Sequence, residues 1–419
     1  MIKKFCRLCG CNKLLKFLDL GSHPPSDQFK NKNQLNELTV YYPLNVCSCL
    51  KCGFKQLDYV VDPKILYQQN YPYGSSLTKS ATEHYTEFAT SSINEFHLNQ
   101  NDLVVDIGSN TGVLLNAFKK KNLKVIGIDP ALNMCKIARK NNIPTINSFF
   151  NKTSVNKILK RHGKAKIVTG TNVFAHVDDL SLFVNNIKFL LDKKKGVAII
   201  EAPHFLHLIK NLEYDTVYHE HLSYITVKPL IPFFKKFNLE IIDIQKRSIH
   251  GGSIRIVISN IGNYKIKKNV KKICLTENKA KLNNTKTLMS FQKKVNENRF
   301  KLISLLTKIK KANQSIVVLS APAKGMTLLN YCKIDKNYID YATDKSKIKQ
   351  GLYTPGSNIP IFSDKKILKT KPDYALLLAW NFSKEIISNN NKFLKRGGKF
   401  IIPIPNLKIV SLKNEKNKT

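Results

Sequence analysis

Short runs of aliphatic and β-branched residues alternate with stretches of helical character through much of this chain. Such alternation is typical of an α/β fold, because each strand of a parallel sheet is followed by a helix that returns the chain to the same edge. One series covers residues of about 80–260, and a second begins near residue 315. The predicted strands are LVVDIGS (103–109), KVIGIDP (124–130), KIVTGTNV (166–173) and GVAIIEAP (196–203) in the first series, and SIVVLSAPAKG (315–325), IDYATDKS (339–346), DYALLLAW (373–380) and KFIIPIPN (399–406) in the second.

The stretch between the two series has a different pattern. Residues 261–312 are rich in Lys and Asn, and apolar residues recur at helical spacing in 287–311, which predicts a helical connector. The N-terminal residues hold many polar breakers and a cluster of cysteines. We therefore expect an α/β protein with a small N-terminal domain (1–70) and two Rossmann-like domains (71–260 and 261–419).

Length and hydropathy are those of a globular protein. The 419 residues can bury a sizeable core, and 42% of them are hydrophobic. No apolar run approaches the roughly 18 residues of a membrane helix. The N-terminal MIKKFCRLCG is basic but lacks the apolar core of a signal peptide. We expect a cytoplasmic protein without a membrane partner.

The formal net charge is +40, from 69 Lys and Arg against 29 Asp and Glu. A field of this sign attracts nucleic acid, anionic lipid or phosphorylated small molecules. The excess is mostly Lys spread along the whole chain, so compositional bias explains it as well as a selected anionic partner does. A nucleotide-linked substrate would satisfy the second interpretation without nucleic acid, which we do not expect as a partner. The sequence predicts no oligomeric state.

The cysteines are concentrated near the N-terminus, where six of the nine lie in the first 52 residues. CRLCG and CLKCG each place two thiols on one turn, and a glycine follows each pair. Two such pairs are typical of a tetrahedral structural zinc site, although free thiols are the alternative. The predicted ligands are Cys6, Cys9, Cys49 and Cys52, with Cys11 and Cys47 as less suitable substitutes.

A glycine turn follows the first predicted strand of the middle domain. LVVDIGSNTGVLL has the spacing D-x-G-x-x-x-G, which is neither the dinucleotide G-x-G-x-x-G nor a P-loop. The next strand ends in Asp129, where an acid can accept both hydroxyls of a ribose. Together these features look like the S-adenosylmethionine site of class I methyltransferases, with a generic turn or an NAD site as alternatives. The candidate cofactor residues are Asp106, Gly108, Ser109, Asn110, Gly112 and Asp129.

The third predicted strand leads into GTNVFAHVDDL (170–180). Polar residues at the carboxyl end of a strand lie at the ligand-facing edge of an open α/β sheet. We therefore predict that Asn172 contacts the cofactor and that His176 lies in the active site, with ordinary packing of the histidine as the alternative.

YDTVYHEHLSYIT (214–226) places two histidines, a glutamate and several tyrosines close together. It would serve as a catalytic base, a metal site or a well-packed piece of core. The string H-E-H differs from the H-E-x-x-H of zinc enzymes, which weakens the metal interpretation. In an extended strand, His219 and His221 would share one face, and Tyr218 and Glu220 the other.

These strings together resemble the nucleotide-sugar C-methyltransferases, a family similar to the enzymes that make 3-C-methylated deoxysugars. The resemblance runs along nearly the whole chain. It implies a zinc-binding domain, a central domain that binds S-adenosylmethionine, and a C-terminal domain that binds a nucleoside-diphosphate 4-keto sugar. Its motifs are CRLCG, CLKCGFKQL, DIGSNTGVLL, NVFAHVDDL, EAPHF, YDTVYHEHLSYIT, HGGSIRI, APAKGMTLLNYC, DKSKIKQGLYTPGSNIPI and LLLAWNF.

The resemblance also implies roles for single residues. It makes His221 the general base, with Tyr218 and Glu220 in support, and it places Tyr73 near the active site. His219, Tyr224, Lys324 and Ser253 are candidates for contact with the substrate, Lys324 through its diphosphate.

The predicted reaction removes a proton from a carbon beside a ketone and methylates the enolate. It needs a base with a pKa near neutrality and stabilisation of the enolate oxygen. Two other functions remain open from sequence: an RNA methyltransferase with a zinc ribbon, and an inactive protein whose methyltransferase fold serves interaction.

Overall fold

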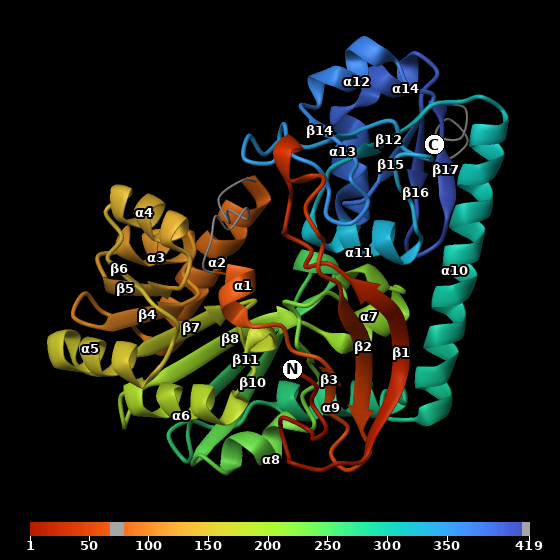
Figure 1. The fold of residues 1–419 in the computed structure, drawn as a ribbon. Coiled ribbons are helices and arrows are strands. Elements are labelled where there is room, and N and C mark those ends of the chain that lie inside the picture. Colours follow the sequence, from red (N-terminus) through yellow and green to blue (C-terminus); the bar gives the residue numbers. More distant parts are fainter. Residues whose placement is uncertain (68–78, 413–419) are drawn as a thin grey trace.

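The computed structural model describes residues 1–67 and 79–412, and their strands form three sheets (Figure 1). The sheets have four, seven and six strands. The predicted α/β architecture, with a small N-terminal domain and two Rossmann-like domains, is confirmed. Within the described ranges, no helix is long and apolar enough to cross a membrane.

The N-terminal sheet is antiparallel, and its last strand comes from far along the chain. Its order is β1-β2-β3-β9, and β9 (Ser223–Tyr224) pairs with β3 (Lys55–Leu57). A piece of the sequence YDTVYHEHLSYIT therefore completes this sheet. The other elements of this region are β1 (Leu14–His23), η1 (Lys32–Gln34), β2 (Tyr42–Cys49) and α1 (Pro63–Tyr67).

The four predicted cysteine ligands come together at the end of β2, which carries Cys49. The Sγ atoms of Cys6 and Cys52 are 3.6 Å apart, as are those of Cys9 and Cys49, and all four lie within 4.8 Å of one another. Tetrahedral zinc with Zn–S bonds of about 2.3 Å separates its sulfurs by about 3.8 Å. The cluster therefore fits a structural zinc ion, and four protein ligands leave no open position on it.

The second sheet has the order β10-β11-β8-β7-β4-β5-β6. The five strands from β8 to β6 are parallel, and β11 runs antiparallel to both β8 and β10. All five residues of β4 are buried, as expected for a central parallel strand covered on both faces. The strands are β4 (Leu103–Ile107), β5 (Lys124–Asp129), β6 (Thr145–Asn147), β7 (Ile167–Thr171), β8 (Val197–Pro203), β10 (Leu239–Arg247) and β11 (Ser253–Asn260).

Helices surround this sheet, and short 3-10 turns follow several of its strands (Figure 1). The connections place loops at the carboxyl ends of the parallel strands, which is the edge where open α/β sheets bind ligands. The helical elements are α2 (Lys79–Phe96), α3 (Val113–Lys119), α4 (Leu132–Lys140), α5 (Lys152–His162), η2 (Phe174–His176), α6 (Leu180–Leu190), α7 (Phe205–Lys210), η3 (Tyr214–Thr216), α8 (Leu230–Lys235) and η4 (Ile249–Gly251).

The third sheet has the order β14-β13-β12-β15-β16-β17, and β17 is antiparallel to its neighbour while the others are parallel. Its strands are β12 (Ile316–Leu319), β13 (Ala342–Thr343), β14 (Ile361–Phe362), β15 (Tyr374–Leu377), β16 (Lys399–Ile402) and β17 (Lys408–Val410), and its helical elements are α11 (Ala323–Tyr331), α12 (Lys365–Thr370), η5 (Trp380–Phe382), α13 (Ser383–Asn389) and α14 (Asn391–Lys395).

The second and third sheets repeat one topology. The order β6-β5-β4-β7-β8-β11 corresponds strand for strand to β14-β13-β12-β15-β16-β17, including the antiparallel last member. The repeat extends to an acid at the end of one strand. Asp129 accepts hydrogen bonds from the amides of Asn110 and Ala131, and Asp344 accepts them from Ala321 and Ser346. The carboxyl edge of the third sheet is therefore built like that of the second.

Two helices form the predicted connector between the sheets: α9 (Lys268–Lys279) and the long α10 (Thr285–Lys311). Figure 1 shows α10 running beside the N-terminal sheet and up to the third sheet. Its buried residues include Phe291 and Leu302, which belong to one apolar cluster with residues of both sheets. The N-terminal and C-terminal parts therefore share a core through α10.

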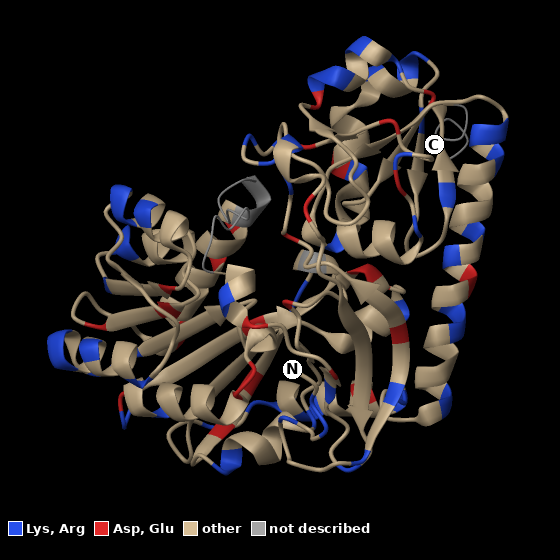
Figure 2. Ribbon diagram, in the orientation of Figure 1, with Lys and Arg blue, Asp and Glu red and all other residues tan. Residues whose placement is uncertain are grey.

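Lys and Arg residues are distributed over all three parts of the molecule, with a row of them along α10 (Figure 2). Acidic residues are fewer. The charge pattern of the ribbon matches the even spread of Lys in the sequence.

We predict that Cys52→Ser lowers the zinc content from about one ion per chain and destabilises the fold, because three thiolates hold zinc less well than four. Zinc content by mass spectrometry and the melting temperature give the measurement. Cys11→Ser is the matched control, since Cys11 lies outside the cluster of four. Full zinc occupancy in Cys52→Ser, with loss in Cys11→Ser, would contradict the assigned ligand set.

Candidate active site

The glycine turn after β4 is tight enough to require glycine. Gly108 has φ 65° and Gly112 has φ 78°, a left-handed conformation that other residues rarely adopt. A Cβ on Gly108 would lie 2.4 Å from Cγ2 of Val173, which follows β7. The turn is therefore packed directly against the loop that carries Asn172 and His176.

Asp129 is held at the end of β5 by two backbone donors. Its Oδ2 accepts from the amide of Asn110 and its Oδ1 from that of Ala131, both at 2.8 Å. Burial raises the pKa of Asp129, while these two donors lower it. The carboxylate thus has a fixed position at the ligand edge, where an acid can accept ribose hydroxyls.

Further polar atoms line the same edge. Asp106 accepts a 2.7 Å hydrogen bond from Thr169, and burial raises the pKa of Asp106 to about 7. Ser109 Oγ and Asn172 Oδ1 are buried and have no hydrogen-bond partner among the described residues. Buried polar atoms without partners are costly, so these two fit a polar ligand such as S-adenosylmethionine.

A cluster of rings lies after β7. The His176 ring in η2 is 5.0 Å from the His221 ring, and Tyr218 stacks against His221 at 4.0 Å. Tyr67, at the end of α1, stacks on the His176 ring, with the two ring centroids 6.0 Å apart. The structure therefore brings together His176, Tyr218 and His221, as the sequence predicted, and adds Tyr67, which the sequence analysis missed.

His221 is oriented by a backbone carbonyl. Its Nδ1 lies 2.8 Å from the carbonyl oxygen of Thr216. A carbonyl can only accept, so Nδ1 carries the hydrogen and the lone pair of the neutral ring is on Nε2. Burial, and then the neighbouring His221, push the pKa of His176 well below its usual value, so His176 is neutral at pH 7. His221 is therefore an oriented base, and the His176 ring beside it is uncharged.

Glu220 is a buried carboxyl group next to the same cluster. It is 2% exposed, and neither carboxyl oxygen has a hydrogen-bond partner in the described part of the chain. Burial, and then the charge of Asp27, raise the pKa of Glu220 to about 8. Tyr67 donates to the Glu220 carbonyl at 3.4 Å. Asp27, from the loop after β1, is a neighbour that no local pattern in the sequence indicated.

The segment YHEH is not extended, which was the condition for His219 and His221 to share one face. The amide of His221 donates to the carbonyl of Tyr218 at 2.9 Å, which closes a turn. His219 therefore departs from His221, and its Nε2 lies 3.2 Å from the carbonyl of Tyr42 in β2. A turn replaces the strand because the chain must pass from η3 to the edge of β3 within a few residues.

The remaining predicted residues lie at other places. Tyr224 packs in β9 with its ring buried, and Ser253 at the start of β11 donates to the carbonyl of Ile249. Lys324, at the start of α11, donates to Asn381 Oδ1 at 2.5 Å and lies 4.0 Å from Asp215. Tyr73 lies outside the described residues.

An ion-pair network anchors α2 beside the ligand edge, and the sequence analysis missed it. Arg255 is 1% exposed and pairs with Glu201 at 2.6 Å and with Glu87 at 2.8 Å. His84 Nε2 lies 2.7 Å from the same Glu201 carboxylate. Glu201 lies in β8 near its carboxyl end, and its carbonyl accepts from the amide of Asn172. The network therefore fixes α2 over the carboxyl ends of the strands.

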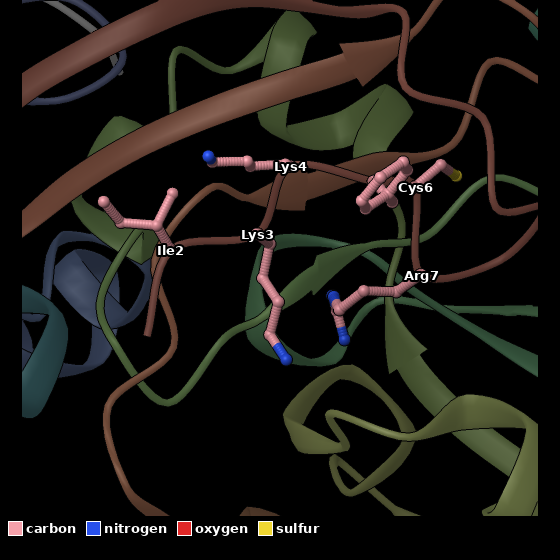
Figure 3. A pocket seen from close by; sticks show the side chains of 6 residues that line it. Ile2, Lys3, Lys4, Cys6 and Arg7 are labelled. Atoms are coloured by element: carbon pink, nitrogen blue, oxygen red, sulfur yellow. The ribbon is translucent and has the colours of Figure 1, made fainter.

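The N-terminal segment beside the cysteine cluster also contacts the site. Figure 3 shows Lys3 and Arg7 pointing to the same side of the N-terminal segment. Lys3 pairs with Asp178 at 2.7 Å, and Arg7 donates to the carbonyls of Val177 and Leu222. Val177 follows His176 and Leu222 follows His221, so one arginine beside Cys6 holds the segments that carry both histidines.

Comparisons with known proteins place the chain in a family. Three family models match the chain in order: a zinc binding domain at residues 6–67, a methyltransferase domain at 81–244, and the C-methyltransferase C-terminal domain at 248–405. The zinc model covers all four clustered cysteines, and the methyltransferase model covers the glycine turn and Asp129.

One curated relative extends along nearly the whole chain. The C-methyltransferase NovU of Streptomyces niveus is 31% identical over 407 residues, which are 97% of this chain and 96% of the relative. Among solved structures, an S-adenosylmethionine-dependent methyltransferase from Clostridium acetobutylicum is 15% identical over 43% of this chain and 92% of its own, with a TM-score of 0.34. Magnesium protoporphyrin IX methyltransferase from Synechocystis with bound SAH is 13% identical over 45% of this chain and 90% of its own, also with a TM-score of 0.34. The chain belongs to the C-methyltransferase family, and it is an S-adenosylmethionine-dependent enzyme that methylates carbon.

Proposed function

We propose that this enzyme methylates carbon 3 of a nucleoside-diphosphate 4-keto sugar, with His221 as the base that removes the proton from that carbon. The observation that carries the proposal is the hydrogen bond from His221 Nδ1 to the Thr216 carbonyl. It directs the basic lone pair to Nε2 within the ring cluster beside the cofactor edge. The choice of a nucleotide sugar rests on the family resemblance of the motifs.

A 4-keto group makes the neighbouring C–H acidic enough for a positioned base. Nε2 of His221 takes the proton, and the C–H electron pair moves into the enolate, whose carbon then bonds to the methyl group. S-adenosylmethionine supplies that methyl from its sulfonium sulfur and leaves as S-adenosylhomocysteine. The protein aligns carbon and methyl and stabilises the negative enolate oxygen.

Glu220 and Tyr218 complete this chemistry in the proposal. A carboxyl group with a raised pKa keeps its proton at neutral pH and can donate it in a hydrogen bond to the enolate oxygen. Tyr218, stacked on His221, limits the rotation of the imidazole ring. His176 stays neutral and therefore does not oppose protonation of His221.

The cofactor and the nucleotide would occupy the two repeated edges. Asp129 would hold the ribose of S-adenosylmethionine, with Asp106, the glycine turn and Asn172 around it. The equivalent edge of the third sheet would take the nucleotide of the sugar, with Lys324 near its diphosphate. The domains of this proposal are 1–70 for zinc, 71–260 for the cofactor and 261–419 for the sugar nucleotide.

A screen of 4-keto nucleotide sugars with S-adenosylmethionine tests the function. We expect one of them to gain the mass of a single methyl group, and NMR should locate that methyl group on carbon 3. The matching 4-hydroxy sugars are the control, because they cannot form the enolate. Methylation of the 4-hydroxy sugars, or of RNA in place of any sugar, would contradict the proposal.

His221→Gln should lower kcat by about 10² to 10⁴-fold, the usual contribution of a general base, while S-adenosylmethionine still binds. Calorimetry and turnover with the identified sugar measure the two effects. Asp129→Ala gives the converse control: it should weaken cofactor binding. Near wild-type turnover in His221→Gln would show that another group is the base.

The protonated Glu220 predicts a fall in kcat as pH rises. Since the pKa of Glu220 is raised to about 8, its proton is present below that pH and is lost above it, which replaces a donor with a negative charge beside the enolate. Glu220→Gln keeps an N–H donor at every pH, so it should remain active and lose this alkaline limb. Profiles of kcat from about pH 6 to about pH 10 compare the two. An identical limb in Glu220→Gln would exclude Glu220 as its source.

A further inference from the structure

The segment that carries His221 is bound tightly by the C-terminal part of the molecule. Trp380 Nε1 donates to Asp215 Oδ2 at 2.6 Å, and Thr327 Oγ1 donates to the carbonyl of Val217 at 2.9 Å. Both bonds are buried. Trp380 lies in η5 after β15, and Thr327 lies in α11, so two elements of the third sheet's ligand edge hold residues 214–217.

Asp215 stands next to the residue that orients the base. Thr216 supplies the carbonyl that accepts from His221 Nδ1. The amide of Thr216 donates to the Glu213 carbonyl at 3.0 Å, and the Asp215 side chain beside it is buried. Asp215 directly precedes Thr216 in the chain, so a displacement of Asp215 is transmitted through the backbone to the carbonyl that orients the His221 ring.

Two charged groups face Asp215 in the described structure, and neither replaces the bond from Trp380. The Lys324 ammonium is 4.0 Å from Asp215 Oδ2 and 4.1 Å from the centre of the Trp380 ring. Glu213 is the second, a buried acid that accepts from Asn211 at 2.9 Å. A buried carboxylate needs directed donors, and the indole N–H is one with short, ordinary geometry.

The repeated topology explains why both sheets reach one segment. η2 follows β7 in the second sheet, and η5 follows β15 at the corresponding place in the third. η2 presents His176 to His221, and η5 presents Trp380 to Asp215. The short stretch 215–221 thus lies between the ligand edges of two equivalent sheets.

We propose that Asp215 and Trp380 are positioning residues for the base: their hydrogen bond fixes the Thr216 carbonyl and thereby holds His221 with the hydrogen on Nδ1. The C-terminal domain then completes the active site as well as binding substrate. This inference rests on the proposed role of His221.

Trp380→Phe tests it, because phenylalanine keeps an aromatic ring for Lys324 and removes the N–H donor. We expect kcat to fall on the order of 10²-fold, the effect of a small misplacement of a catalytic group, with the affinity for S-adenosylmethionine unchanged. Asp215→Leu keeps the approximate size of the side chain and removes the acceptor, so it provides a second variant if the first fails to fold. Tyr341→Phe is the matched control, since it removes a hydroxyl group whose hydrogen bond to Thr370 lies within the C-terminal domain.

The deciding readout is the nitrogen spectrum of His221, assigned by comparison with His221→Gln. In the wild type, the ¹⁵N shifts of the neutral ring should report hydrogen on Nδ1. In Trp380→Phe or Asp215→Leu they should move toward a mixture of tautomers, and they should stay unchanged in Tyr341→Phe. An unchanged spectrum in both variants overturns the inference, whether or not kcat falls, and so does an altered spectrum with wild-type kcat.

The spectrum also separates this inference from the proposed function. It needs no sugar substrate, so it can be recorded on the full chain with S-adenosylmethionine alone. A failure of every 4-keto sugar to react would overturn the proposed substrate, and the tautomer comparison would still decide whether Trp380 and Asp215 orient His221.

Discussion

The hydrogen bond between His221 Nδ1 and the Thr216 carbonyl depends on the position of one peptide, and contacts from three directions fix that position. Trp380 and Thr327 bind the residues on either side of Thr216, Arg7 binds the carbonyl of Leu222, and β3 pairs with β9. These contacts restrict the position of the imidazole through the backbone that orients it. The histidine segment is therefore the point where all three sheets meet.

The repeated sheet topology explains why two ligand-binding edges meet at this segment. Open α/β sheets bind ligands at their carboxyl edges, and here two such edges approach the same buried stretch. The proposed reaction joins two nucleotide-linked molecules, whose reactive groups must meet while the rest of each molecule is held apart. Two equivalent edges on either side of one segment would provide that separation.

The sequence predicted the features that local pattern determines. Cysteine spacing gave the four sulfurs of the cluster, and strand-turn-helix patterns gave the glycine turn and Asp129, because each depends on residues close together in the chain. Contacts across the fold were not predictable in the same way. Tyr67, Asp27 and Trp380 reach the site from separate elements, and the turn at 218–221 arises because β9 must join β3. For the same reason His219 and His221 do not share the face that an extended strand would have given them.

The pairing of β9 with β3 also bears on how the chain assembles. The N-terminal sheet lacks its fourth strand until residues 223–224 have been made, long after the cysteines have left the ribosome. During that interval β3 presents unpaired backbone groups, an edge of the kind that invites wrong pairing with other chains. The first part to be synthesised is therefore among the last to be completed, and its final strand is supplied by the same stretch that carries the histidines.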